Sequence, residues 1–166
     1  MNMGKILENT FDDAEGEGGQ YLTFILANEE YGVEILRVQE IRGWTKVTPM
    51  PNQPSYLRGV INLRGNIVPI IDLRERFGIE SMEYGATTVV IVIRVESEDT
   101  ERIMGIVVDA VSEVYTVNDS DRQPPPDLGN AIGEQFVNGL VSVDEKMVIL
   151  LDVDLLLNEG VLDSAA

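Results

Sequence analysis

Apolar and polar side chains alternate along much of the chain, as they do in β-strands that bury one face. In residues 20–26 the alternating apolar positions are Leu22, Phe24 and Leu26. A second strand is predicted over residues 31–35. Residues 36–41 (LRVQEI) favour a short helical turn that ends at Gly43.

A β-hairpin is predicted where two apolar runs, residues 57–63 and 66–73, flank Arg64-Gly65-Asn66. Pro69 has no backbone N–H to donate, so we expect its strand to lie at a sheet edge or to contain a bulge. The preceding residues 48–55 contain three prolines and predict a loop.

Five further strands are predicted in the second half of the chain. They cover residues 88–95, 104–109, 111–117, 136–143 and 146–151. A long loop with the triplet Pro124-Pro125-Pro126 interrupts them, and a short helix is predicted around residues 154–158.

The second half repeats the first. Residues 30–41 align with 103–114 at an offset of 73, and residues 57–78 align with 137–158 at an offset of 80. Identical residues occur at the pairs Gly32/Gly105, Val38/Val111, Glu40/Glu113, Gly59/Gly139, Val68/Val148 and Asp72/Asp152. Apolar positions share one phase across both blocks, so two similar structural units are expected.

The pattern therefore predicts an all-β fold: two five-stranded β-barrel subdomains around a shared hydrophobic core, with short helices. We expect the first barrel at about residues 20–80 and the second at about 86–157. Residues 1–19 are acidic and glycine-bearing and are expected to form a mobile tail, and residues 158–166 a second tail.

Composition removes several classes of chemistry. The chain has no His and no Cys, which excludes a Ser-His-Asp triad, a Cys nucleophile and thiolate or imidazole metal ligands. We expect neither a cofactor nor a metal ion. The longest apolar run is too short to span a bilayer, and we expect no secretory signal.

The net charge of −17 argues against nucleic-acid binding, and it is unevenly distributed. Residues 37–76 hold seven basic and three acidic residues, a local net charge of +4. A locally basic region on an acidic protein suggests a contact with another protein. The alternative is that these arginines are simply solvated.

Asp72 and Asp152 occupy equivalent repeat positions and could form an acid/base pair. Each also stands where a strand runs into a short helix, so we favour helix capping for both. Trp44, the only tryptophan, fits either a protein contact or the core.

Three segments carry a resemblance to a known family. They are EEYGVEILRVQEIRG (29–43), LRGVINLRGNIVPIIDLR (57–74) and GIVVDAVSEV (105–114). From residue 20 to 157 the chain resembles the CheW family, whose signature is shared with the regulatory domain of the CheA kinase. The length of the chain favours an adaptor over the kinase or a CheV-type fusion, because ATP-binding boxes, a phosphorylatable His and a receiver domain are missing.

The resemblance implies two SH3-like barrels and a non-catalytic, cytoplasmic adaptor, monomeric when free, that couples chemoreceptors to a CheA-type histidine kinase in chemotaxis. The cytoplasmic tip of the receptor would bind a groove at Val38, Gly59, Asn62, Arg64, Val89, Gly105 and Val114. The regulatory barrel of the kinase would bind at Glu40, Ile41, Arg42, Gly43, Trp44, Met50 and Pro51. The two surfaces are expected to act separately.

Two alternatives stay open at this point. The adaptor could serve a non-flagellar signalling array that controls surface motility or gene expression. The protein could instead be a carboxylate-dependent enzyme on a β-barrel. The internal repeat and the lack of a polar cluster argue against this alternative.

Overall fold

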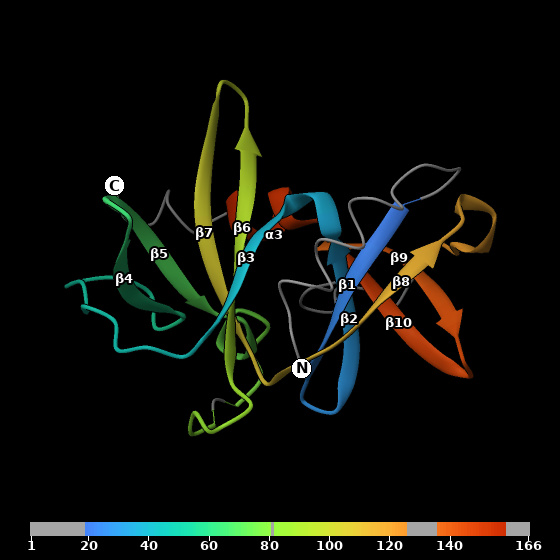
Figure 1. Ribbon diagram of the computed structural model, residues 1–166, viewed down its shortest axis with the longest axis horizontal. Coiled ribbons are helices and arrows are strands. Elements are labelled where there is room, and N and C mark those ends of the chain that lie inside the picture. The colour runs from blue at the N-terminus through green and yellow to red at the C-terminus, as the bar shows by residue number, and fades with distance from the viewer. Residues whose placement is uncertain (1–18, 81, 126–135, 159–166) are drawn as a thin grey trace.

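The computed structural model describes residues 19–80, 82–125 and 136–158. These residues form ten strands, two short α-helices and two 3-10 turns, which confirms the all-β prediction (Figure 1). The predicted tails, apart from Gly19 and Asn158, and Pro126 of the proline triplet lie outside the described residues. None of the helices in the described residues has the length and apolar character that a membrane span requires.

The strands form two five-stranded sheets. Sheet A has the order β8-β1-β2-β10-β9 and sheet B the order β3-β6-β7-β5-β4. Sheet A comprises β1 (Gly19–Leu26), β2 (Glu29–Glu34), β8 (Ala110–Val117), β9 (Val137–Val143) and β10 (Lys146–Leu151). Sheet B comprises β3 (Val38–Gly43), β4 (Leu57–Leu63), β5 (Asn66–Asp72), β6 (Val89–Ser97) and β7 (Thr100–Val108).

Each sheet curls until its two edges meet. In sheet B the chain that leaves β3 pairs at Thr48 with Val60 of β4, through two backbone hydrogen bonds of 2.9 Å. In sheet A the chain that leaves β8 pairs at Gln123 with Leu140 of β9, through two bonds of 2.8 Å. These bridges close the two sheets into the predicted barrels.

The predicted barrel boundaries, about 20–80 and about 86–157, do not match the sheets. Sheet A combines β1 and β2 with β8, β9 and β10, and sheet B combines β6 and β7 with β3, β4 and β5. The halves of the repeat are therefore interleaved, each giving its first hairpin to one barrel and its last three strands to the other. The repeat identifies equivalent strands, but it does not state which strands pair.

The predicted helical turn over residues 36–41 is also wrong for most of its length. Only Ile35–Arg37 form a 3-10 turn (η1), and β3 begins at Val38. The pairing of β3 with β6 skips one residue between Val38 and Glu40, a β-bulge at Gln39. The bulge shifts the alternation, so that Val38 and Ile41, three residues apart, both face the main core.

Pro69 lies in β5, which is an interior strand rather than the expected edge strand. The parallel ladder between β5 and β7 begins only at Ile70, so it needs no N–H from Pro69. The irregularity of the hairpin falls in the partner strand β4, where the register shifts between Leu57 and Gly59.

Three apolar clusters hold the fold together. The largest lies between the sheets and includes Leu22, Phe24, Val33, Ile91, Ile93 and Leu156, which makes it the shared core that the sequence predicts. Smaller clusters fill the two barrels, with Val68, Ile70 and Val92 in barrel B and Val148, Leu150 and Tyr21 in barrel A. Strand β6 alternates between two clusters and is buried on both faces.

Asp72 caps helix α2 (Leu73–Arg76), as predicted, with one carboxylate oxygen accepting from the backbone N–H groups of Arg74 and Glu75. Its side chain is 2% exposed, and the other oxygen accepts a 2.5 Å hydrogen bond from the Tyr84 hydroxyl. Arg58 Nε in turn donates to that hydroxyl at 2.8 Å. Burial and the bond to Asp72 raise the pKa of Tyr84 to about 12, so the phenol stays protonated and donates at neutral pH.

Asp152, the equivalent residue, caps helix α3 (Val153–Asn158) by accepting from Leu155 N–H at 3.1 Å. We predict that Asp72→Asn lowers the free energy of unfolding by about 2–4 kcal/mol, because it removes a buried, paired charge. Asp152→Asn should cost less than about 1 kcal/mol, since the cap keeps an oxygen acceptor. Urea denaturation of both variants measures the difference. Equal losses would mean that the Arg58–Tyr84 network adds nothing.

Asp109 joins the two barrels. It is the single residue between β7 and β8, and its carboxylate accepts 2.9 and 2.8 Å bonds from Nε and Nη2 of Arg74 in α2. It also accepts from Ala27 N–H in the β1–β2 turn at 2.9 Å. Burial by itself would raise the pKa of Asp109, but the hydrogen bonds from Arg74 and Ala27 outweigh it and hold the pKa below its usual value.

Because the pKa of Asp109 is lower in the folded state, its contribution to stability is full above about pH 4–5 and is lost as pH falls through the folded pKa. Asp109→Asn should therefore destabilise the protein at pH 7, with a smaller effect near pH 3. Thermal unfolding between pH 3 and 7 measures this. Asp99→Asn, at an exposed turn, is the control and should change little at any pH. If Asp109→Asn lowered the melting temperature equally at every pH, the lowered pKa of Asp109 would not be the cause of its stabilising effect.

Candidate protein-binding surface on barrel B

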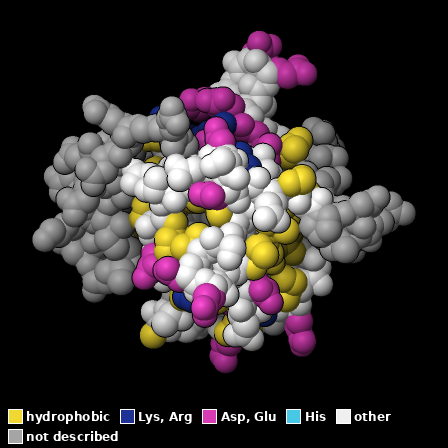
Figure 2. Space-filling view, turned by 90° about the vertical axis from the view of Figure 1, so that its right-hand side faces the viewer, with side chains coloured by type: hydrophobic (Ala, Val, Ile, Leu, Met, Phe, Trp, Pro, Cys, Tyr) yellow, Lys and Arg dark blue, Asp and Glu magenta, His cyan; other side chains and the backbone are white. Residues whose placement is uncertain are grey.

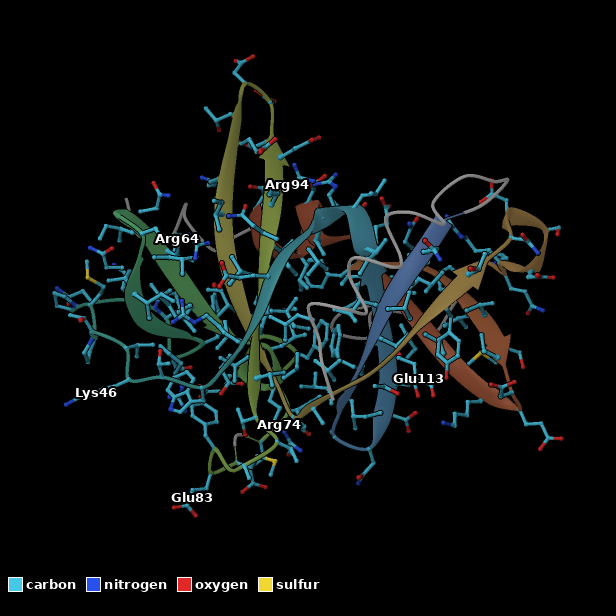
Figure 3. The ribbon with its side chains drawn as sticks, in the orientation of Figure 1. Lys46, Arg64, Arg74, Glu83, Arg94 and Glu113 are labelled. Carbon is cyan, nitrogen blue, oxygen red and sulfur yellow. The ribbon has the colours of Figure 1, made fainter. Side chains whose placement is uncertain are left out.

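The β4–β5 turn carries the most prominent charged contact on barrel B. Arg64 lies at its tip and hydrogen-bonds the Glu40 carboxylate of β3, while its own side chain stays 67% exposed (Figure 3). Arg42 Nη1 lies 4.0 Å from the other Glu40 oxygen. β3 and β4 are the opposite edges of sheet B, so this ion pair forms only because the sheet curls.

The backbone of the turn explains why Arg64 projects outward. Arg64 and Gly65 have φ angles of 52° and 89°, as a two-residue type I′ hairpin turn requires. Gly65 N–H donates a 2.8 Å hydrogen bond to the Asn62 side-chain oxygen. Asn62 therefore fixes the turn that presents Arg64, and it is itself exposed.

Gly59 shapes the neighbouring loop. Its φ is 147°, and a Cβ at this position would lie 2.3 Å from the carbonyl oxygen of Thr48. Only glycine lets the loop approach β4 closely enough for the Thr48–Val60 bridge. This bridge holds the start of the exposed segment with Met50 and Pro51.

Trp44 is half-buried and packs on the barrel B core rather than standing free. Its ring lies 4.3 Å from the Tyr84 ring, centroid to centroid, tilted by 56°. Tyr84 also donates a hydrogen bond to Asp72, so Trp44 packs against a member of the Arg58–Tyr84–Asp72 network. Gly43 beside it is exposed, whereas Ile41 is partly buried against the main core.

Five of the predicted receptor positions are buried or partly buried, and one of them is Gly59, described above. Val38 is buried in the main core, and Val89 and Val114 pack against that core while partly exposed. Gly105 is buried between β5 and β6, where an added Cβ would lie 2.7 Å from Ile70 Cδ1 and 2.8 Å from Val90 Cγ1. Val114 belongs to sheet A, and the other six receptor positions lie on sheet B or its β4–β5 turn.

The two predicted surfaces are in contact with each other within the protein. Arg64, assigned to the receptor, binds Glu40, assigned to the kinase. Gly59, assigned to the receptor, supports the loop that carries Met50, assigned to the kinase. Contacts between residues 11 to 24 positions apart depend on how the barrel closes, which the sequence pattern does not reveal.

The basic region of the sequence is largely neutralised within the protein. Five of its seven basic side chains form ion pairs: Arg37, Arg42, Arg58, Arg64 and Arg74. Arg76 lies over the rings of Tyr56 and Phe136. Among the five, Arg64 has the most exposed side chain, so it is best placed to meet a partner.

Each barrel also exposes a large apolar side chain after a hairpin turn, and the sequence pattern missed both. Ile67 is 64% exposed and pairs with Asn62 beside the Arg64 turn. Its repeat equivalent Met147, on β10, is 52% exposed. The end of the molecule toward barrel A shows apolar patches bordered by acidic side chains (Figure 2). An apolar residue at the second position after a two-residue hairpin turn is a signal that could have found both positions.

The arrangement on barrel B suits recognition of a protein surface. It combines a charged fork in Arg64, an apolar neighbour in Ile67 and an exposed loop at Met50. In the described residues no group of three or more Asp or Glu side chains is placed to hold a metal ion. Asp72 and Asp152, the possible acid/base pair, cap different helices.

Comparison with known proteins agrees with this arrangement. The model of the CheW-like domain family matches residues 20–161. The chemotaxis protein CheW of Klebsiella aerogenes is 44% identical over 144 residues, covering 87% of this chain and 84% of the relative. The chemotaxis protein CheW of Rhizobium meliloti is 41% identical, covering 82% and 86%.

A solved structure shares the fold. The crystal structure of the scaffolding protein TtCheW from Thermoanaerobacter tengcongensis superposes with a TM-score of 0.77 at 32% sequence identity. The alignment covers 88% of this chain and 92% of that protein. With the family match over most of its length, the chain belongs to the CheW family.

Proposed function

We propose that this protein is a non-catalytic adaptor that couples chemoreceptors to a CheA-type histidine kinase in chemotaxis signalling. The observation that carries the proposal is the family match over residues 20–161, on a chain that folds as the same two-barrel scaffold. An adaptor needs surfaces rather than a reaction centre, and barrel B presents such a surface around Arg64. The adaptor works in the cytoplasm at receptor arrays and is monomeric when free.

The receptor contact is proposed at the groove around Arg64. Arg64 and Asn62 are the exposed members that can touch a receptor helix directly. Val38, Gly59, Val89, Gly105 and Val114 act mainly by shaping the barrel beneath them, since they are buried or partly buried. Ile67 extends the groove as an apolar neighbour. The guanidinium of Arg64 offers a planar fork to a carboxylate or carbonyl oxygen.

The kinase contact is proposed on strand β3 and the loop after it. Glu40, Arg42 and Gly43 lie on the edge strand of sheet B, and Met50 and Pro51 are exposed in the loop. Ile41 and Trp44 support this surface from the core side. We assign the binding unit to residues 20–157, with 1–19 and 158–166 as tails.

Reconstitution tests the function directly. The full chain, mixed with a receptor cytoplasmic fragment and a CheA-type kinase of the same organism, should form a ternary complex and make kinase activity depend on the receptor. Size-exclusion chromatography and a phosphorylation assay measure the two effects. If the chain binds neither protein, or if kinase activity ignores the receptor at saturating adaptor, the adaptor proposal fails.

We predict that Arg64→Ala weakens receptor binding by about 10- to 150-fold, since a charge-assisted hydrogen bond is lost. The melting temperature should change by only a few degrees, because exposed ion pairs contribute at most about 1 kcal/mol. Kinase binding should fall much less, although release of Glu40 makes some change expected. Calorimetry with each partner separates the two effects.

Asp144→Ala is the matched control, because Asp144 occupies the same turn position in the β9–β10 hairpin, with φ of 49° against 52° for Arg64. It should leave receptor affinity unchanged. The double variant Arg64→Ala/Glu40→Ala completes a cycle that measures coupling between the two surfaces. Unchanged receptor affinity in Arg64→Ala would remove Arg64 from the receptor contact.

A further inference from the structure

Two parts of the chain are built alike and dock alike. Module 1 is β4–β5–α2 and module 2 is β9–β10–α3 (Figure 1). Each module docks through a parallel ladder: Ile70 of module 1 lies opposite Gly105 of β7, and Leu150 of module 2 lies opposite Gly32 of β2. The ladders and the glycines that they face are equivalent, so backbone pairing alone does not determine which module belongs on which strand.

Chain connectivity leaves the choice open as well. Residues 44–56, thirteen in number, connect β3 to module 1, and residues 118–136, nineteen in number, connect β8 to module 2. At about 3.3–3.6 Å per residue these connections reach roughly 45 and 65 Å. A domain of this size has a radius of gyration of about 14 Å, so either module can reach either strand.

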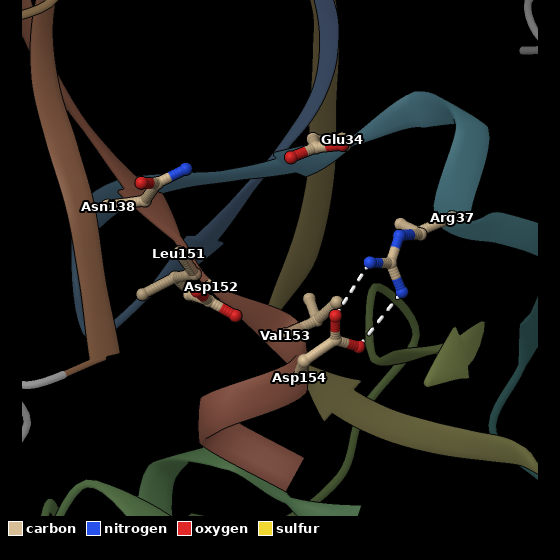
Figure 4. Close-up of a pocket in the computed structure, with 7 residues that line it drawn as sticks. All are labelled: Glu34, Arg37, Asn138, Leu151, Asp152, Val153 and Asp154. Carbon is tan, nitrogen blue, oxygen red and sulfur yellow. Dashed lines mark hydrogen bonds and ion pairs between the residues drawn. The ribbon is translucent and has the colours of Figure 1, made fainter. Parts of the chain in front are cut away.

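The two modules differ in charge at one equivalent position. Arg74 of α2 and Asp154 of α3 stand at the repeat offset of 80. Arg74 donates two hydrogen bonds to Asp109, which follows β7. Asp154 accepts two, of 2.9 and 2.6 Å, from Arg37, which follows β2 (Figure 4). A bidentate Arg–Asp ion pair thus occurs at both places, with the arginine on module 1 in one and the aspartate on module 2 in the other.

The surroundings of the two pairs are similar, although Glu96 Oε2 also lies 3.7 Å from Arg37 Nη2. In each, the carboxylate also accepts a backbone N–H from the hairpin of the opposite barrel: Asp109 from Ala27, and Asp154 from Glu96 at 2.8 Å. All four charged side chains are only 17–30% exposed. Like charges at these positions would be largely screened from water and costly.

We propose that this charge reversal determines which module docks on which barrel. If the modules exchanged places, Arg74 would meet Arg37 and Asp154 would meet Asp109. Both contacts would change from attraction to repulsion, while the apolar faces would still be buried. The four charges therefore select one arrangement from two of similar shape, as complementary charges select register and partner in other assemblies.

Three charge-reversed variants test the proposal. Arg74→Asp/Asp154→Arg reverses the modules, and Arg37→Asp/Asp109→Arg reverses the sites that receive them. Each double variant should lose about 5–10 °C in melting temperature, or should dock its modules in exchanged places. The quadruple variant restores opposite charges in both native contacts and should recover at least half of that loss. Lys46→Glu/Glu83→Lys, at two exposed positions in no ion pair among the described residues, is the control and should leave the melting temperature unchanged (Figure 3).

Placement is read from backbone nuclear Overhauser effects of Gly32. In the native arrangement Gly32 contacts Leu150, and in the exchanged arrangement it would contact Ile70. Recovery in the quadruple variant supports the proposal even where a double variant does not fold. The proposal is overturned if the quadruple variant is no more stable than the double variants, or if both double variants keep native stability and native contacts.

Discussion

The architecture depends on two short connections that carry the chain from one sheet to the other. Only Ile35–Arg37 separate β2 from β3, and only Asp109 separates β7 from β8. A crossover to the far edge of β1 would have to run back along a strand of six residues, about 20 Å, whereas three linking residues reach only about 14 Å. A hairpin directly beside β2 or β7 is blocked as well, because β10 and β5 pair with those edges. The chain therefore continues into the opposite sheet at both connections, and the two halves interleave.

Interleaving explains the central core. Because each half contributes to both barrels, the barrels cannot separate without breaking strand pairing or bending the two short connections. The largest apolar cluster accordingly lies between the sheets, and β6 is buried on both faces. The bidentate pairs Arg37–Asp154 and Arg74–Asp109 occur just where the chain passes from one barrel to the other. A surface built on barrel B is thereby connected to barrel A through the shared core and the two ion pairs.

Much of the fold could be predicted because its determinants are local. The alternation in β1, the Arg64-Gly65 turn and the Asp72 cap each depend on a few consecutive residues. β3 was missed because a bulge at Gln39 puts Val38 and Ile41 on one side, a spacing that looks helical. The barrel boundaries were predicted wrongly because a sequence repeat shows which strands are equivalent but not which strands pair with each other. The proposed site residues come from the family resemblance, and their contacts arise from barrel closure between residues distant in sequence.

The proposed binding surface contains an exposed arginine because the other arginines of the basic region have partners within the protein. In a protein with a net charge of −17, an arginine readily finds a carboxylate of the same chain to pair with. Most arginines in residues 37–76 are bound to carboxylates or lie over aromatic rings. Arg64 is only partly neutralised in this way. It pairs with Glu40, yet the positive φ of its turn lifts it away from the barrel and leaves most of its side chain in water. An exposed pair of this kind contributes little free energy, so under the proposed function it could be exchanged for a partner's carboxylate. The turn geometry therefore exposes the guanidinium of Arg64, and the ion pair with Glu40 orients it.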